Sequence, residues 1–178
     1  FFRDQGYGFL IPSYRYNAGH GGIPGEEQLI RDGQAVLNWL RSKGHDDDQF
    51  VLYGESLGSG VAISLAQNNV GRAVILEGPY SSITDVAAEV YWFLPVRALI
   101  KDEFDSKSYI GNLIPPVLIL HGARDKTIPV KFAQKLHSHG NPHKDRIIVY
   151  PDGEHTGLYA HGADRDVAAF LSVTSIGN

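Results

Sequence analysis

The chain has 178 residues, a formal net charge of −4, and a composition that is 43% hydrophobic and 20% charged. This length suffices for one domain with a hydrophobic core, and the acidic balance excludes the basic surface typical of nucleic-acid-binding proteins. No apolar run approaches the ~20 residues needed to span a bilayer, and the absence of cysteine excludes disulfides and thiolate chemistry. We expect a soluble, cytoplasmic protein with no nucleic-acid partner.

The first elements in chain order are the end of a helix, a strand and a longer helix. Residues 1–6 resemble the last turn of a helix closed by a glycine, so we expect the natural chain to begin earlier. The apolar run 8–12 predicts a short strand, and residues 26–43 predict a helix that ends at Gly44. The apolar positions of this helix share one face: Leu29, Gly33, Val36, Leu37 and Leu40.

The rest of the chain alternates between continuous apolar runs and amphipathic runs. The predicted strands are 50–53, 73–77, 117–120 and 147–150, and the predicted helices are 57–68, 130–138 and about 163–171. Fully apolar strands that alternate with helices predict a mainly parallel sheet covered on both faces. No repeat or low-complexity linker divides the chain, so residues 1–178 predict a single α/β domain.

A serine stands where a predicted strand meets a predicted helix, in the sequence Gly54-Glu55-Ser56-Leu57-Gly58. This Gly-x-Ser-x-Gly pattern is typical of the nucleophile elbow of serine hydrolases, in which a tight turn exposes the hydroxyl at the carboxyl edge of the sheet. The flanking glycines would leave room for the turn and permit positive φ angles. Ser56 is therefore a candidate nucleophile, and the alternative is a small residue that only suits the tight turn.

Asp125 and His155 each follow a predicted strand, as Ser56 does, so parallel strands would bring all three to one edge of the sheet. A serine hydroxyl needs a base to become a nucleophile, and the base needs an acid to orient it. We assign these roles to His155 and Asp125. Three alternatives remain open: Asp125 could form a turn or a helix cap, His155 could be a solvated loop residue, and Asp152 could be the acid.

Residues 79–115 interrupt the alternation, because they separate two predicted strands by far more than a crossover needs. The segment is rich in aromatic and aliphatic residues and leaves the carboxyl end of a strand near Ser56. We expect a small cap that lines an apolar substrate pocket, with Tyr91, Phe93 and Leu94 in contact with the substrate. The alternative is a pair of ordinary packing helices.

These motifs resemble those of the α/β-hydrolase superfamily, and within it the Bem46-like branch, which is related to the ABHD17- and ABHD13-type hydrolases and to the serine aminopeptidase S33 domain. The resemblance implies an α/β-hydrolase fold that contains the equivalents of the fourth to eighth strands, with a small helical cap. The matching stretches cover nearly the whole chain: Tyr14-Arg15, 26–40, 52–60, 76–82, 120–125 and 153–155.

The resemblance also implies roles for individual residues. Ser56 matches the nucleophile of the family, Asp125 its acid and His155 its base, and the N–H of Leu57 matches one donor of the oxyanion hole. The third strand of the family sheet lies between the fourth and fifth strands, and the loop after it supplies the second oxyanion donor. That strand and that loop would precede Phe1, which leaves a gap in the sheet.

Other histidine-containing stretches have simpler explanations. His20-Gly21-Gly22 imitates an oxyanion motif but follows the wrong strand, and His121 is expected to be structural. The three histidines within residues 137–143 are expected to be a solvated cluster rather than a metal site. The chemistry of serine, histidine and aspartate needs no metal and no organic cofactor.

The leading hypothesis is a cofactor-independent serine hydrolase that cleaves carboxylic esters or thioesters with an apolar acyl group. It would act through an acyl-enzyme intermediate, and its partner would be a small-molecule acyl ester. Two alternatives stay open. The same three residues could hydrolyse amides in a serine peptidase, or the domain could be catalytically silent and serve binding.

Overall fold

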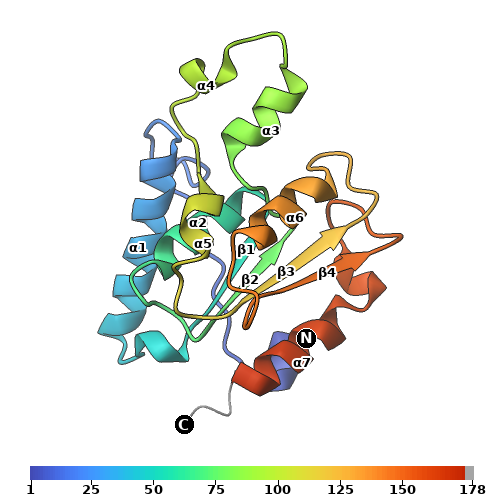
Figure 1. The fold of residues 1–178 in the computed structure, drawn as a ribbon. Coiled ribbons are helices and arrows are strands. Elements are labelled where there is room, and N and C mark those ends of the chain that lie inside the picture. Colours follow the sequence, from blue (N-terminus) through green and yellow to red (C-terminus); the bar gives the residue numbers. More distant parts are fainter. Residues whose placement is uncertain (175–178) are drawn as a thin grey trace.

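Four parallel strands form the centre of the protein in the computed structural model, which describes residues 1–174 (Figure 1). They lie in the order β1 (Val51–Glu55), β2 (Ala73–Glu77), β3 (Val117–Gly122) and β4 (Arg146–Tyr150). Every residue of β2 and β3 is buried, because both faces of these central strands are covered. The predicted α/β class and the mainly parallel sheet are confirmed.

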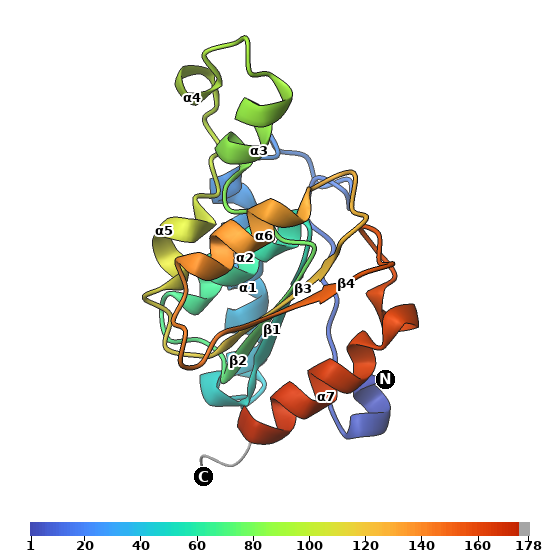
Figure 2. The same ribbon diagram turned by 45° about the vertical axis from the view of Figure 1, so that its right-hand side comes forward.

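Helices cover both faces of the sheet (Figure 2), and the four predicted helices are present with small shifts at their ends. No helix of residues 1–174 combines the length and apolar character that crossing a bilayer requires. The α-helices are α1 (Glu26–Ser42), α2 (Leu57–Ala66), α3 (Ile83–Val90), α4 (Val96–Leu99), α5 (Ser106–Ile110), α6 (Val130–Ser138) and α7 (Ala163–Thr174), and the 3₁₀ helices are η1 (Phe2–Gln5), η2 (Asp47–Gln49) and η3 (Leu158–His161).

Two hydrophobic clusters hold these layers together, one on each face of the sheet. On the first face, α1, α2, α5 and α6 bury residues such as Leu37, Ile63 and Leu136. On the second face, α7 and η3 bury Val167 and Leu158 against the sheet, and η1 packs at the border of this cluster. The carboxyl ends of all four strands are left at one edge, where the loops that carry Ser56, Asp125 and His155 emerge.

The prediction of a strand at residues 8–12 is wrong. These residues are irregular, and side chains such as Phe9 and Ile11 are 68% and 84% exposed. Within residues 1–174, β1 pairs only with β2, and a groove of about 1430 Å³ separates its other edge from residues 6–12. A short apolar run forms a strand only when a neighbour satisfies its backbone groups, and residues 8–12 have no such neighbour in the described part of the chain.

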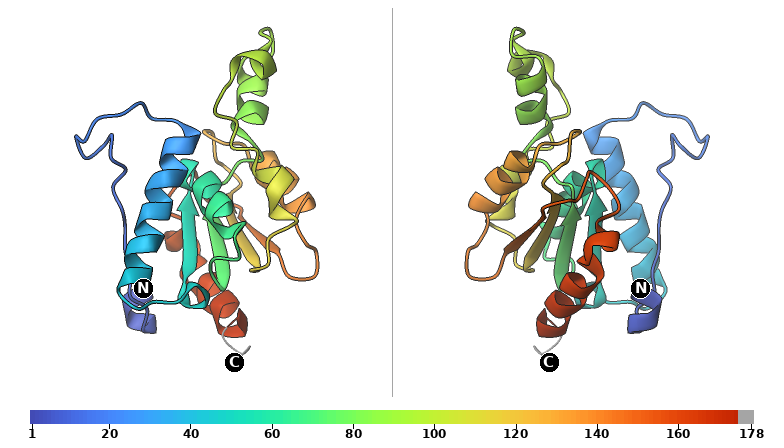
Figure 3. Two further views of the ribbon diagram at one scale, coloured as in Figure 1. Left: turned by 90° about the vertical axis from the view of Figure 1, so that its left-hand side faces the viewer. Right: turned by 90° about the vertical axis from the view of Figure 1, so that its right-hand side faces the viewer.

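Helices α3 and α4 and the loops beside them form an arm, residues 83–100, that projects beyond the carboxyl edge of the sheet (Figure 3). The arm begins at a well-formed helix cap, since the Ser82 hydroxyl accepts a hydrogen bond from the Asp85 N–H at 2.9 Å. Its far end carries consecutive exposed apolar side chains from Val90 to Leu94. Residues 83–100 therefore project from the body of the protein, whereas α5, which the predicted cap 79–115 also includes, packs in the first hydrophobic cluster through Ile110.

A buried carboxylate anchors the base of this arm. The Asp85 side chain is only 4% exposed and lies 2.9 Å from Lys135, 3.2 Å from Lys107 and 3.3 Å from Arg97, and it accepts a hydrogen bond from Ser81 at 2.7 Å. Burial raises the pKa of Asp85, but the hydrogen bonds from Lys135, Ser81 and Lys107 outweigh burial and hold the pKa well below its usual range. The carboxylate thus joins α3, α4, α5 and α6.

Replacing Asp85 with asparagine is expected to lower the free energy of unfolding by about 1.5 kcal/mol at neutral pH. This value is the lower end of the range for hydrogen bonds to charged groups, and we choose it because Lys135 and Arg97 are partly exposed. The folded pKa lies below the unfolded value of about 3.9, so this stabilisation is present above that pH and is lost as the pH falls below it. Urea unfolding at several pH values measures both effects. Glu89→Gln, which removes the exposed pair with Lys131, is the control and should change stability by less than about 0.5 kcal/mol. Equal losses in the two variants would contradict the anchoring role.

Candidate active site

Ser56 occupies the turn between β1 and α2 with a strained backbone, at φ 50° and ψ −118°. These are the angles of the first central residue of a type II′ turn, a position that glycine dominates. The positive φ therefore falls on the serine itself and not on Gly54 or Gly58. Gly54 serves a steric purpose, because a Cβ there would lie 2.4 Å from the Gly58 carbonyl oxygen. The motif thus lets β1 and α2 approach closely and presents Ser56 at the sheet edge.

The side chains of Ser56, His155 and Asp125 form one continuous chain of hydrogen bonds. Ser56 Oγ lies 3.0 Å from His155 Nε2, and His155 Nδ1 lies 2.7 Å from Asp125 Oδ2. An ionised carboxylate only accepts, so Nδ1 carries the proton of a neutral ring and Nε2 is free to accept from the serine hydroxyl. The loops after β1, β3 and β4 supply the three groups, as the sequence predicted.

Asp125 is held in place by its own loop. Its side chain is fully buried, and Oδ1 accepts the N–H groups of Thr127 and Ile128, each at 2.8 Å. The predicted role as a turn former and the role as partner of His155 therefore coexist, one for each carboxylate oxygen. Asp125 is the carboxylate that contacts His155, whereas the side chain of the alternative acid, Asp152, is 67% exposed and pairs with Arg124 at 2.6 Å.

The chain is similar to proteins from distant organisms. An uncharacterized protein of Mycobacterium tuberculosis strain H37Rv is 33% identical over 145 residues, which cover 81% of the chain and 52% of that protein. The alpha/beta hydrolase domain-containing protein WAV2 of Arabidopsis thaliana is 27% identical over 171 residues, which cover 85% of the chain and 55% of that protein. The chain spans about half the length of these curated relatives.

Among solved structures, an acetyl xylan esterase from Paenibacillus sp. R4 has a TM-score of 0.66 and 18% sequence identity, and the match covers 85% of the chain and 58% of the esterase. No protein-family model matches the chain. The chain belongs to the α/β-hydrolase superfamily. The α/β-hydrolase fold predicted from the sequence motifs is thereby confirmed, and the Bem46-like branch stays a prediction.

In this α/β-hydrolase fold, the residue after the serine begins a helix. Leu57 is the first residue of α2, so its N–H has no carbonyl within the helix to which it can donate. The buried Tyr80 hydroxyl donates to the Leu57 carbonyl oxygen at 3.2 Å and steadies this turn. An N–H at a fixed helix start next to Ser56, with no acceptor among residues 1–174, is what a donor to a developing oxyanion requires.

The predicted substrate-binding residues lie at the far end of the arm, residues 83–100. Tyr91, Phe93 and Leu94 are 50%, 65% and 47% exposed, and Phe93 packs edge-to-face against Trp92. The arm turns these side chains toward solvent, so their contact with a substrate remains a prediction.

The histidines for which the sequence suggested no catalytic role differ in their burial. His20 lies exposed in the loop before α1, and residues 1–174 hold no cluster of three or more histidine and acidic side chains suited to a metal. His121, by contrast, is fully buried beside Asp125 in this α/β-hydrolase fold. Gly78 was also missed: it has φ +57° and lies directly against the His155 ring. Both residues lie in stretches that match the family, 120–125 and 76–82, but nothing in the sequence indicated their contacts with Asp125 and His155.

Proposed function

We propose that the protein is a serine hydrolase that cleaves carboxylic esters or thioesters with an apolar acyl group. The observation that carries this proposal is the hydrogen-bonded order Ser56–His155–Asp125 on a strained turn at the sheet edge. Membership of the α/β-hydrolase superfamily and the likeness of the fold to an acetyl xylan esterase support it. We extend the proposal to the Bem46-like branch on the motifs described above.

In the proposed first half-reaction, Ser56 Oγ attacks the acyl carbon while His155 Nε2 takes the hydroxyl proton. Asp125 holds the ring in the tautomer that leaves Nε2 free, and its charge stabilises the imidazolium that forms. The Leu57 N–H donates to the oxyanion, a contact that is worth roughly 2.7–4 kcal/mol in the transition state. His155 then gives its proton to the leaving alcohol or thiol, and an acyl-enzyme remains.

In the second half-reaction, water attacks the acyl carbon while His155 accepts a water proton. Collapse of the tetrahedral intermediate breaks the bond to Ser56 Oγ, which recovers its proton from His155, and the carboxylic acid leaves. Side chains, backbone and water suffice for each step. The partner is a small-molecule acyl ester, and the preference for an apolar acyl group rests on the apolar arm residues Tyr91, Phe93 and Leu94.

A fluorophosphonate probe tests the proposal directly, because it phosphonylates only an activated serine. We expect one label on the folded protein, located at Ser56 by peptide mass spectrometry. Ser56→Ala should abolish labelling, while Ser59→Ala, which removes a neighbouring hydroxyl that donates to the Ser56 carbonyl at 2.6 Å, should retain it. A folded protein that is not labelled, or is labelled elsewhere, would support the catalytically silent alternative.

Substrate class is tested by comparing p-nitrophenyl esters of increasing acyl length with aminoacyl anilides. The proposal predicts hydrolysis of the esters, with kcat/KM rising as the acyl chain lengthens. Higher kcat/KM for the anilides would overturn the esterase assignment in favour of a peptidase. A flat dependence on acyl length would remove the apolar preference and leave the serine chemistry intact.

Gly78→Ala is expected to impair the site more than the fold. Its positive φ disfavours a side chain by roughly 1–2 kcal/mol, and the new Cβ would lie 3.2 Å from His155 Cε1 and 3.3 Å from Nδ1. Displacing the ring should lower kcat by about 10²-fold. Gly44→Ala is the matched control, since Gly44 has φ +88° but no atom within 4 Å of its Cβ. Equal kcat in the two variants would contradict the steric argument.

A further inference from the structure

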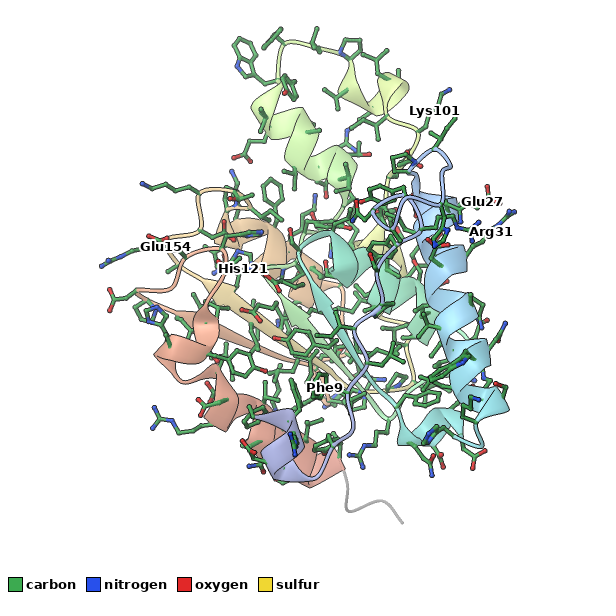
Figure 4. The ribbon with its side chains drawn as sticks, turned by 180° about the vertical axis from the view of Figure 1, so that it is seen from behind. Phe9, Glu27, Arg31, Lys101, His121 and Glu154 are labelled. Carbon is green, nitrogen blue, oxygen red and sulfur yellow. The ribbon has the colours of Figure 1, made fainter. Side chains whose placement is uncertain are left out.

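A second histidine contacts the buried side of the proposed catalytic acid. His121, near the carboxyl end of β3, has a fully buried side chain whose Nε2 lies 2.8 Å from the Ile128 carbonyl oxygen and 3.2 Å from Asp125 Oδ2. In Figure 4, His121 lies beside the loop that carries Glu154, the residue before His155. Two imidazole rings therefore contact the same carboxylate oxygen, one partly exposed and one fully buried.

The partners of His121 determine its tautomer. A carbonyl oxygen only accepts, so Nε2 must carry the proton and donate to Ile128. Burial lowers the pKa of His121 below its ordinary value, which keeps the ring neutral and leaves Nδ1 without a proton. Nδ1 has no hydrogen-bond partner within residues 1–174. The ring is thus a neutral donor to the loop that also packs against the acid.

We infer that His121 is a positioning residue that holds Asp125 in the orientation that His155 requires, an inference that rests on the proposed hydrolase function. Ile128 donates its N–H to Asp125 Oδ1 and accepts from His121 Nε2, so the strand end, the acid and the loop form one closed network. His121 Nε2 also lies 3.2 Å from Asp125 Oδ2, the oxygen that accepts from His155 Nδ1, although its N–H donates to Ile128.

The neutrality of His121 matters for catalysis. The titratable groups that interact electrostatically with His121 are Asp125 and His155. A charged His121 would place a cation 3.2 Å from Asp125 and compete for the charge that must stabilise the His155 imidazolium. A neutral ring orients the carboxylate through Ile128 and by direct contact, and leaves its charge available to His155.

The decisive test compares His121→Gln with His121→Asn in the whole chain. The longer glutamine amide can place an N–H where Nε2 lies, and the shorter asparagine amide cannot, although both bury an amide. We expect the asparagine variant to lose about 10²-fold in kcat with little change in KM, and the glutamine variant to recover most of that loss. Leu118→Ala is the control for lost stability, because it creates a cavity at a buried position of the same strand, away from Asp125.

A second readout needs no substrate and no variant at position 121. In Ser56→Ala, the proton between His155 Nδ1 and Asp125 should still give a low-field NMR resonance, and nitrogen-15 shifts should show His121 as the neutral Nε2–H tautomer at pH 7. The Nδ1–H tautomer or an imidazolium would overturn the inference, as would equal kcat in the two amide variants. If the wild-type protein shows no labelling at Ser56, the proposed function fails, and the tautomer still tests the network on its own.

Discussion

Replacing His155 with alanine is expected to lower kcat about 10⁶-fold, as large a loss as replacing Ser56 itself. Without the base, the serine hydroxyl keeps its proton, and without the serine, the base has no nucleophile to activate. The double variant should therefore be no slower than either single variant. Kinetics on one p-nitrophenyl ester, with all three variants and the wild-type protein, measures this non-additivity.

The residual rate in these variants is informative as well. About 10³–10⁴-fold acceleration over the uncatalysed reaction should persist if the Leu57 N–H and the binding site still act on the substrate. Losses that multiply in the double variant would contradict the model of a single catalytic unit. Circular dichroism and unfolding curves serve as the control. We expect every variant to keep the fold, because Ser56 and His155 lie in loops at the edge of the sheet.

Asp125→Asn is expected to lower kcat about 10⁴-fold without unfolding the loop. The asparagine oxygen can still accept the N–H groups of Thr127 and Ile128, which now bind Oδ1 at 2.8 Å. The amide nitrogen would then face His155 Nδ1 and donate to it. That donation favours the tautomer with its proton on Nε2, and such a ring cannot accept the proton of Ser56.

Asp152→Asn is the matched control for this prediction, because it makes the same chemical change in the loop that carries His155. Asp152 is 67% exposed and, within residues 1–174, forms an ion pair only with Arg124, so we expect kcat to stay near the wild-type value. A loss in Asp152→Asn comparable to that in Asp125→Asn would return the acid role to Asp152. Crystal structures of both variants would show which carboxamide contacts His155.

The sequence predicted the sheet well where local pattern and tertiary environment agree. Strands β2 and β3 consist of continuous apolar residues because both faces are buried, and this pattern is visible without a structure. The run 8–12 has the same local character but lacks a neighbouring strand within the described residues. Pairing is a non-local property, so the sequence of the run alone could not show that it would stay irregular.

The candidate site likewise divides into features that local sequence predicts and features that depend on non-local contacts. Ser56, Asp125 and His155 were predictable because each follows a strand of a parallel sheet, and the topology brings those ends together. The contact of His121 with Asp125 was not, since it depends on which face of β3 the side chain occupies and on the path of the next loop. The direction of the arm that carries Tyr91 was not predictable either, because no periodic pattern fixes how a projecting segment leaves the body.

The backbone angles of Ser56 set its proposed catalytic role against thermodynamic stability. A non-glycine residue at φ 50° and ψ −118° costs of order 1–3 kcal/mol, which the surrounding fold must offset. Glycine would adopt these angles freely, so Ser56→Gly should raise the melting temperature while it removes the nucleophile. Selection for stability alone would therefore favour glycine at this position, whereas the proposed function requires the serine hydroxyl.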